Sequence, residues 1–149
     1  MTNSVLPMKI QLTRDVKPPS RGTSLSAGLD FYVPNDYSQT LSSGQSALIP
    51  SGVKAHVPTG HALVAFNKSG VATKHGLIVG ACVVDEDYEG EIHLHVINVT
   101  EGEVSINPGM KLIQFLLLPV NYAVPQVVDQ LLPRNTERGS GGFGSTGTH

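Results

Sequence analysis

The sequence has little of several residue types, and each shortage narrows what the protein can be. It has one cysteine, Cys82, among 149 residues, so no disulfide can form within the chain and no cysteine cluster can bind a metal. So little cysteine fits a reducing compartment, and residues 1–12 lack the basic start and apolar core of a signal peptide. We therefore expect an intracellular protein, in the cytoplasm or the nucleus.

Charge and long apolar runs are also scarce. The net charge is −2, so no excess of positive charge attracts nucleic acid or an anionic membrane. The longest apolar candidate, residues 112–120, has the length of a strand and not of a membrane span. We expect no binding to nucleic acid or membranes, and an anionic ligand must meet a local cluster of positive groups.

Glycine and proline are plentiful, and their spacing predicts an all-β domain over residues 1–132. The 16 glycines and 10 prolines separate short segments, as turns do between antiparallel strands. Ile92, Leu94 and Val96 alternate with other residues, the period of a strand with one buried face. A sandwich or jelly roll follows, with a single helical turn at Val71–His75. The expected strands are Lys9–Leu12, Leu29–Tyr32, Ser46–Ile49, Val53–Val57, His61–Asn67, Leu77–Val84, Glu91–Asn98, Val104–Ile106 and Leu112–Val120.

Residues 133–149 have the composition of a flexible arm. Five of the last twelve residues are glycine, and such a segment buries too little surface to order itself. It nevertheless carries Arg138, whose guanidinium suits phosphate oxygens, and Phe143, whose ring can stack on a base. We interpret it as a lid over a phosphorylated aromatic ligand; the alternative is a disordered, solubilising tail.

A cluster of acidic residues follows two valines in the segment 83–91. The pattern predicts a strand, a tight turn and a second strand from Glu91. On an extended backbone Asp85 and Asp87 share one face and Glu86 takes the other. A carboxylate at this tip can act as a general base or help to hold a divalent cation; the alternative is a solvated acidic turn.

His93 and His95 alternate on one expected strand, as a zinc-binding pair does. No third ligand is apparent in the sequence, so we expect both to lie on a solvated or interfacial face.

Five segments resemble, in order and along nearly the whole chain, the motifs of the homotrimeric deoxyuridine triphosphatase (dUTPase) family. The third and the fifth together are specific to this family. The segments are Ala27–Asp30, Lys68–Ala72 with Lys74–Gly76 after it, Gly80–Glu91, Gly109–Gln114 and Arg138–Gly147.

The resemblance implies a jelly-roll subunit in a homotrimer, with active sites at subunit interfaces and the arm of one chain closing the pocket of another. The implied reaction is hydrolysis of dUTP to dUMP and pyrophosphate, by in-line attack of water on the α-phosphorus. A Mg²⁺ ion would neutralise and orient the phosphates.

The resemblance also implies roles for single residues. Asp85 is the general base, and Asp30 and Gln114 hold metal-bound or catalytic waters. Tyr88 packs under the deoxyribose and leaves no room for a 2′-hydroxyl group. Its alternative is a tyrosine that covers the edge of the core.

Uracil recognition in the family uses backbone groups, here around Ala81, Cys82 and Val83. Cys82 stands where the family often has glycine. Its thiol either narrows the pocket or points into the core as a small apolar group, and we favour the core.

The phosphates are expected to meet the second motif and the arm. Lys68 supplies charge, and Ser69 and Gly70 supply a hydroxyl group and an amide. In the arm, Arg138 clamps the γ-phosphate and Phe143 stacks on uracil. Gly144, Ser145 and Thr146 complete the substrate-binding set.

The chain departs from the family pattern twice. Asn67-Lys68 replaces Pro-Arg, and Met110-Lys111 replaces Asp-Arg. Lysine keeps the charge of arginine but loses its planar fork, so we expect an active enzyme with altered kinetics. Two other functions stay open: a nucleotide-sensing protein that switches an unidentified regulatory partner, and a dCTP deaminase, which shares this architecture.

Overall fold

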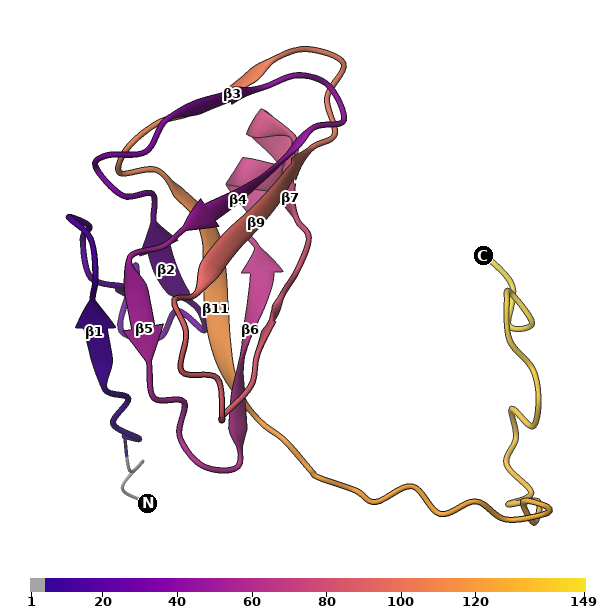
Figure 1. Ribbon diagram of the computed structural model, residues 1–149. Coiled ribbons are helices and arrows are strands. Elements are labelled where there is room, and N and C mark those ends of the chain that lie inside the picture. The colour runs from indigo at the N-terminus through magenta and orange to yellow at the C-terminus, as the bar shows by residue number, and fades with distance from the viewer. Residues whose placement is uncertain (1–4) are drawn as a thin grey trace.

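The computed structural model describes residues 5–149, which form an all-β body followed by an extended arm (Figure 1). A single helical turn, η1 (Val71–His75), interrupts the strands as predicted. The strands are β1 (Ile10–Leu12), β2 (Leu29–Tyr32), β3 (Gln39–Leu41), β4 (Ser46–Pro50), β5 (Val53–Ala55), β6 (His61–Asn67), β7 (Leu77–Val79), β8 (Val83–Val84), β9 (His93–Asn98), β10 (Val104–Ile106) and β11 (Lys111–Pro119).

Two antiparallel sheets pack face to face. One has the order β2-β11-β6-β8 and the other the order β4-β9-β7, and Figure 1 shows the second sheet in front of the first. The pairs β1–β5 and β10–β3 extend the body at its sides. The predicted all-β jelly-roll class is confirmed.

The core lies between the two sheets because alternate residues of each strand point inward. In β9, Leu94 and Val96 are buried, and Ile92 just before the strand is buried with them, as the alternation predicts. From the other sheet come Phe31 and Phe115, whose ring centroids lie 4.5 Å apart. This contact between β2 and β11 fixes the strands that carry Asp30 and Gln114.

Three strand predictions were wrong. The strand β3 was missed because it is short and has one buried residue, Leu41. The expected strand Leu77–Val84 is two strands in different sheets, β7 and β8, separated at Gly80. The hairpin between β8 and β9 does not form, because β8 pairs with β6 while β9 pairs with β4 and β7. Residues 80–92 are therefore a long excursion between the paired strands β7 and β9.

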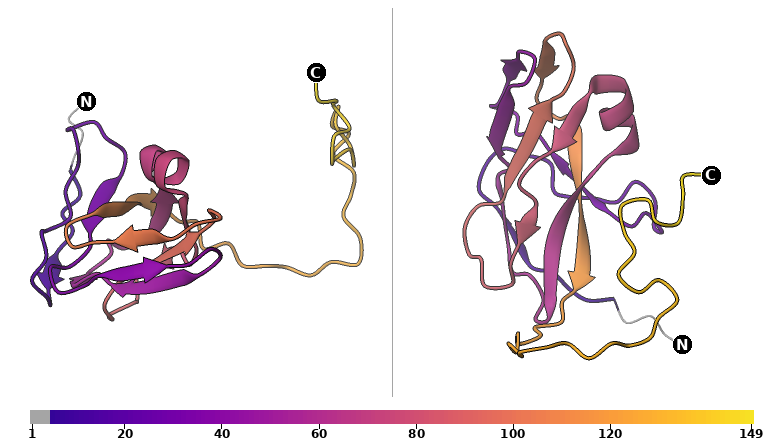
Figure 2. Two further views of the ribbon diagram at one scale, coloured as in Figure 1. Left: turned by 90° about the horizontal axis from the view of Figure 1, so that it is seen from above. Right: turned by 90° about the vertical axis from the view of Figure 1, so that its right-hand side faces the viewer.

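The arm leaves the body after β11 ends at Pro119 and runs away from it (Figures 1 and 2). Residues 120–140 are all exposed, and the Phe143 side chain is fully exposed. The last regular element thus ends earlier than residue 132, and the boundary between domain and arm stays a prediction. Across the described residues 5–149, no helix is long and apolar enough to cross a membrane.

Candidate active site

The excursion between β7 and β9 lines a pocket of about 190 Å³. The pocket brings together five residues that the sequence predicted for the substrate site: Ala81, Cys82, Val83, Asp85 and Tyr88. The other lining residues come from four strands and from the residue just before β9. They are Leu48 of β4, Val84 of β8, Ile92, His93 of β9 and Phe115 of β11.

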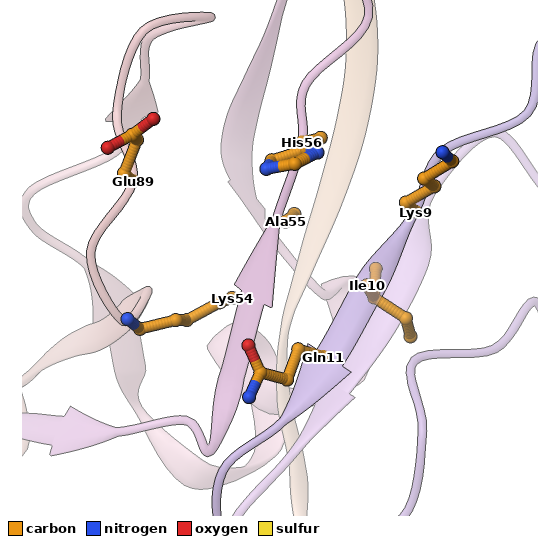
Figure 3. A pocket seen from close by; sticks show the side chains of 7 residues that line it. All are labelled: Lys9, Ile10, Gln11, Lys54, Ala55, His56 and Glu89. Atoms are coloured by element: carbon orange, nitrogen blue, oxygen red, sulfur yellow. The ribbon is translucent and has the colours of Figure 1, made fainter.

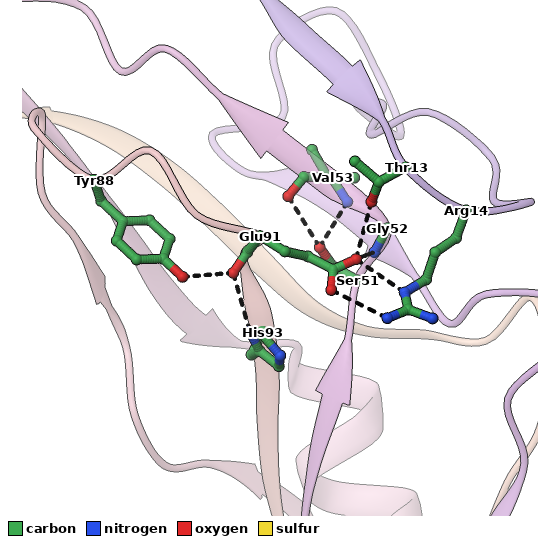
Figure 4. Close-up of polar contacts among 8 residues, drawn as sticks. All are labelled: Thr13, Arg14, Ser51, Gly52, Val53, Tyr88, Glu91 and His93. Carbon is green, nitrogen blue, oxygen red and sulfur yellow. Dashed lines mark hydrogen bonds and ion pairs between the residues drawn. The ribbon is translucent and has the colours of Figure 1, made fainter.

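Two contacts hold Tyr88 in place at the pocket: a hydrogen bond from its hydroxyl group and the packing of its ring against Gly90. The hydroxyl donates a hydrogen bond of 2.7 Å to the carbonyl oxygen of Glu91 (Figure 4). A Cβ atom at Gly90 would lie 2.4 Å from the same hydroxyl oxygen, so only glycine lets the ring fold over this position. The ring remains 43% exposed and offers its surface to a ligand.

Glu91 anchors the end of the excursion to the start of the chain (Figure 4). Its carboxylate forms an ion pair with Arg14 at 2.9 Å and accepts hydrogen bonds from the Thr13 hydroxyl and the Gly52 amide, each at 3.0 Å. The Arg14 hydrogen bond, helped by those from Thr13 and Gly52, lowers the pKa of Glu91 below its usual value. The sequence alone does not predict this contact because Arg14 and Glu91 lie in distant segments.

Glu91→Gln is expected to destabilise the fold by about 1–2 kcal/mol at neutral pH, because Arg14 loses its charged partner. The folded-state pKa of Glu91 is lowered, so its contribution is present above the unfolded-state pKa and lost as pH falls through the folded-state value. The unfolding free energies of wild type and Glu91→Gln, measured by urea from pH 7 to 3, should therefore converge in acid. A constant gap across this range would contradict the role of the ionised carboxylate.

Within the part of the chain that the structure describes, the strand β8 lies at the edge of its sheet and pairs with β6 alone, so its other side presents unpaired backbone groups. The Ala65 amide donates a 2.7 Å hydrogen bond to the Cys82 carbonyl, and Val84 stands opposite Leu63. Hydrogen bonding alternates along an antiparallel strand, so the amide and carbonyl groups of Val83 face away from β6. Val83 thus offers one donor and one acceptor at the open edge, beside the pocket.

Cys82 is exposed and lines the pocket. The preference for a core position was wrong. Cys82 lies in the excursion before β8, where its side chain faces the pocket and not the core.

The acidic tip forms the tight turn that the sequence predicted, and its backbone is not extended at Asp85–Asp87. The Tyr88 amide donates to the Asp85 carbonyl at 3.2 Å, so strict alternation does not apply at these residues. The Asp85 side chain is exposed and lines the pocket. Glu86 instead accepts hydrogen bonds from the Tyr122 hydroxyl at 2.7 Å and the Gly60 amide at 2.6 Å, and these two bonds lower the pKa of Glu86. Glu86 therefore fixes Tyr122, shortly after the end of β11, next to the acidic tip.

A second group of predicted residues gathers around the buried Asp30. Lys68 Nζ lies 2.5 Å from Asp30 Oδ1 and Lys111 Nζ lies 3.8 Å from Asp30 Oδ2, while the Asp30 side chain is 7% exposed. Two ammonium groups around one carboxylate leave a net positive charge directly before Ser69 and Gly70. The two lysines that depart from the family pattern thus share one acidic partner.

Gln114 faces Asp30 across the β11–β2 pair and packs on Gly28. A Cβ atom at Gly28 would lie 2.3 Å from Gln114 Oε1, so the glycine provides the space for this side chain. The side-chain amide nitrogen of Gln114 donates a hydrogen bond of 2.9 Å to the Asn67 carbonyl, which fixes the orientation of the Gln114 side chain.

The donor set does not fit a metal ion bound by the protein alone. Both carboxylate oxygens of Asp30 face lysine ammonium groups, which repel a cation. Within residues 5–149, no group of three or more His, Cys, Asp or Glu side chains is placed to hold a metal. The assignment of metal-bound waters to Asp30 and Gln114 stays a prediction that this arrangement does not favour.

Within one chain, the residues predicted for the substrate site form three separate groups: the pocket residues, the residues around Asp30, and the arm residues. Among the described residues, the pocket lining includes neither the Lys68 group nor any arm residue. Arg138, Ser145 and Thr146 instead line a hollow within the arm, and Phe143 points into solvent. The structure thus joins Ala81 to Tyr88 and joins Lys68 to Asp30, but does not bring the groups together.

A larger cavity of about 380 Å³ lies between the β1–β5 pair and the loop that carries Glu89 (Figure 3). Its lining includes none of the residues predicted to bind substrate, so its size does not make it the substrate site. The lining residues are Lys9, Ile10, Gln11, Lys54, Ala55, His56 and Glu89.

Comparison with known proteins identifies the family. The dUTPase family model matches residues 14–147. The deoxyuridine 5′-triphosphate nucleotidohydrolase of Paraburkholderia xenovorans is 39% identical over 134 residues, 88% of this chain and 89% of its own length. That of Burkholderia mallei is 39% identical over 132 residues, 87% of this chain and 88% of its own. Among solved structures, a dUTPase mutant of Staphylococcus bacteriophage 80alpha with dUpNHpp has a TM-score of 0.86 at 20% identity, covering 96% of this chain and 99% of its own. The chain belongs to the dUTPase family.

Proposed function

We propose that the protein hydrolyses dUTP to dUMP and pyrophosphate, which lowers the dUTP pool and supplies the precursor of dTTP. The observation that carries this function is the pocket itself. It places a free backbone edge at Val83, an exposed carboxylate at Asp85 and an aromatic platform at Tyr88 around one space. Membership in the dUTPase family and relatives named deoxyuridine 5′-triphosphate nucleotidohydrolase support this substrate.

Uracil binds at the open edge of β8. The Val83 amide donates and its carbonyl accepts, which matches the carbonyl and N3–H groups of uracil. Cytosine presents an amino group where uracil has a carbonyl oxygen, so a backbone donor at that point is left unpaired. A buried polar group without a partner discriminates strongly between such ligands.

Tyr88 carries the deoxyribose and rejects a 2′-hydroxyl group by steric exclusion. Tyr88→Ala is expected to raise the kcat/KM of UTP relative to that of dUTP by about tenfold or more, because the platform no longer fills this space. Tyr88→Phe keeps the ring and loses the bond to Glu91, so it should keep the discrimination. The ratio is measured by pyrophosphate release from each nucleotide, and an unchanged ratio in Tyr88→Ala refutes the role.

Asp85 accepts a proton from the attacking water, whose oxygen then bonds to the α-phosphorus. The bond from the α-phosphorus to the oxygen that bridges it to the β-phosphorus breaks, and this oxygen leaves with pyrophosphate. Hydrolysis of dUTP in ¹⁸O-labelled water tests this position of attack. Mass spectrometry should find the label in dUMP and none in pyrophosphate. Label in pyrophosphate would place the attack on the β-phosphorus and contradict the proposed reaction.

The separation of the three groups of residues supports a homotrimer as the active form. One chain supplies the pocket, a second supplies Lys68, Ser69, Gly70 and Gln114, and an arm supplies Arg138, Phe143, Gly144, Ser145 and Thr146. The arm projects away from its own body, which suits closure over another chain. Closure excludes bulk water from the reacting phosphate.

Mg²⁺ is proposed to arrive with the substrate, because residues 5–149 offer no group of three or more His, Cys, Asp or Glu side chains that could hold a metal. Mg²⁺ in phosphate sites is commonly held by substrate phosphates. When bound, it would neutralise the triphosphate. One solved relative, the phage phi11 dUTPase, is described with a structural Mg(II) ion.

The alternatives are less well supported. The matched relatives are named for hydrolysis of deoxyuridine triphosphate, which favours hydrolysis over deamination of dCTP. Ammonia release from dCTP would revive the deaminase. A regulatory partner stays a prediction, and a pull-down whose captured proteins change with a non-hydrolysable dUTP analogue would support it.

A further inference from the structure

His95, on β9, bonds to two consecutive residues, Gly80 and Ala81, at the beginning of the substrate loop, which is the excursion formed by residues 80–92. Its carbonyl oxygen accepts a hydrogen bond of 3.0 Å from the Gly80 amide. Its ring nitrogen Nδ1 accepts one of 2.8 Å from the Ala81 amide. Nδ1 is therefore unprotonated, and the ring carries its proton on Nε2. The sequence predicts a solvated or interfacial face for His95, whereas its side chain is half-buried and bonded to the Ala81 amide.

The contact also explains why residue 80 is glycine. A Cβ atom there would lie 2.1 Å from His95 Nδ1 and 2.4 Å from Cε1, which is far inside van der Waals contact. The side chain of His95 thus occupies the space that any larger residue at position 80 needs. Gly80 and His95 fit each other as a pair.

The position of Ala81 just before β8 gives this contact its meaning. Ala81 lies in a bend two residues before Val83, so the direction of its amide is set by the bond to His95 and not by the pairing of β8 with β6. His95 takes up the amide of Ala81 and leaves that of Val83 to the pocket. The amide of Ala81 is therefore not available to a base, and the backbone recognition predicted for Ala81 passes to Val83.

We propose that His95 is a positioning residue for base recognition. It fixes the direction in which the chain enters β8 and takes up the amide of Ala81, so that a pyrimidine meets the donor and the acceptor of Val83. This role rests on the proposed hydrolysis of dUTP. His95 acts through the loop and not on the reacting phosphate, so its loss changes binding and base selection more than the chemical step.

The first test compares His95→Leu with His95→Asn. Leucine fills space without an acceptor, whereas Asn Oδ1 branches from the side chain as His Nδ1 does and keeps the acceptor. His95→Leu is expected to raise the KM for dUTP about tenfold, the size of one lost hydrogen bond, with kcat changed less than about twofold. Its preference for dUTP over dCTP should fall, and His95→Asn should restore both values toward wild type.

The rate of amide hydrogen exchange at Ala81, measured by NMR without substrate, reports on the hydrogen bond to His95 independently of activity. Exchange should accelerate in His95→Leu and stay slow in wild type and His95→Asn. If exchange accelerates while KM and base preference stay unchanged, the positioning role is overturned and dUTP hydrolysis still stands. If wild type does not hydrolyse dUTP, the proposed function fails, whatever Ala81 shows.

A second test uses the close contact between Gly80 and the His95 ring. Gly80→Ala should raise KM in the wild-type background, where the new methyl group meets the imidazole ring. In a His95→Ala background the same change should be nearly neutral, because the space is empty. Additive effects of the two substitutions would overturn the pairing of Gly80 with His95.

Discussion

Asp85→Asn is expected to lower the kcat for dUTP by about 10²–10⁴-fold, the range that a positioned general base contributes. The affinity for a non-hydrolysable dUTP analogue should change little, because asparagine keeps the size of the side chain. The fold should also be unaffected. Asp85 is exposed, and within residues 5–149 its carboxylate takes part in no hydrogen bond or ion pair of the protein.

Asp87→Asn is the matched control for this experiment. It removes the same charge from the same acidic turn, but Asp87 does not line the pocket with Tyr88. Its kcat should stay close to wild type. A wild-type kcat in Asp85→Asn would remove Asp85 as the base. An equal loss in both variants would show that the charge of the tip matters and not the position of Asp85.

Deletion of residues 138–149 is expected to lower kcat/KM by at least about 100-fold and to leave the thermal midpoint unchanged. The loss follows because Arg138 and Phe143 no longer cover the phosphates and the base, and water enters the site. The body should stay intact because the bonds described for this segment join it to other arm residues. Full activity of the truncated protein would make the segment a solubilising tail.

A mixing experiment separates closure in trans from closure within one chain. Truncated chains and Asp85→Asn chains are each nearly inactive, but a mixed trimer can pair an intact Asp85 pocket with an intact arm from its neighbour. Refolding the two together should recover part of the activity. No recovery, in trimers shown to contain both chains, would contradict the proposed exchange of arms.

The alternation of apolar residues predicted β9 and the inner layer well. The residues Ile92, Leu94 and Val96 are buried as expected, because the period of a strand depends on its own sequence. The residues Asp85 and Tyr88 lie in one pocket because they are close in the chain. Local sequence was therefore sufficient for the central part of the site.

Contacts between distant segments were not predicted. The pairing of β8 with β6, which left Cys82 exposed and Val83 at an edge, depends on the whole sheet. The roles of Glu91 toward Arg14 and of His95 toward Ala81 depend on side chains that meet across strands. A glycine at position 80 was one local sign, since its space is taken by the His95 ring.

The central claim is that the protein selects dUTP by its base and its sugar and releases pyrophosphate. The most direct measurement is pyrophosphate release from dUTP, UTP, dCTP and dTTP, each with Mg²⁺ and then with EDTA, on a sample shown to be folded. The account predicts release from dUTP alone, strongly reduced by EDTA. Equal release from all four nucleotides, or none from dUTP, would contradict it.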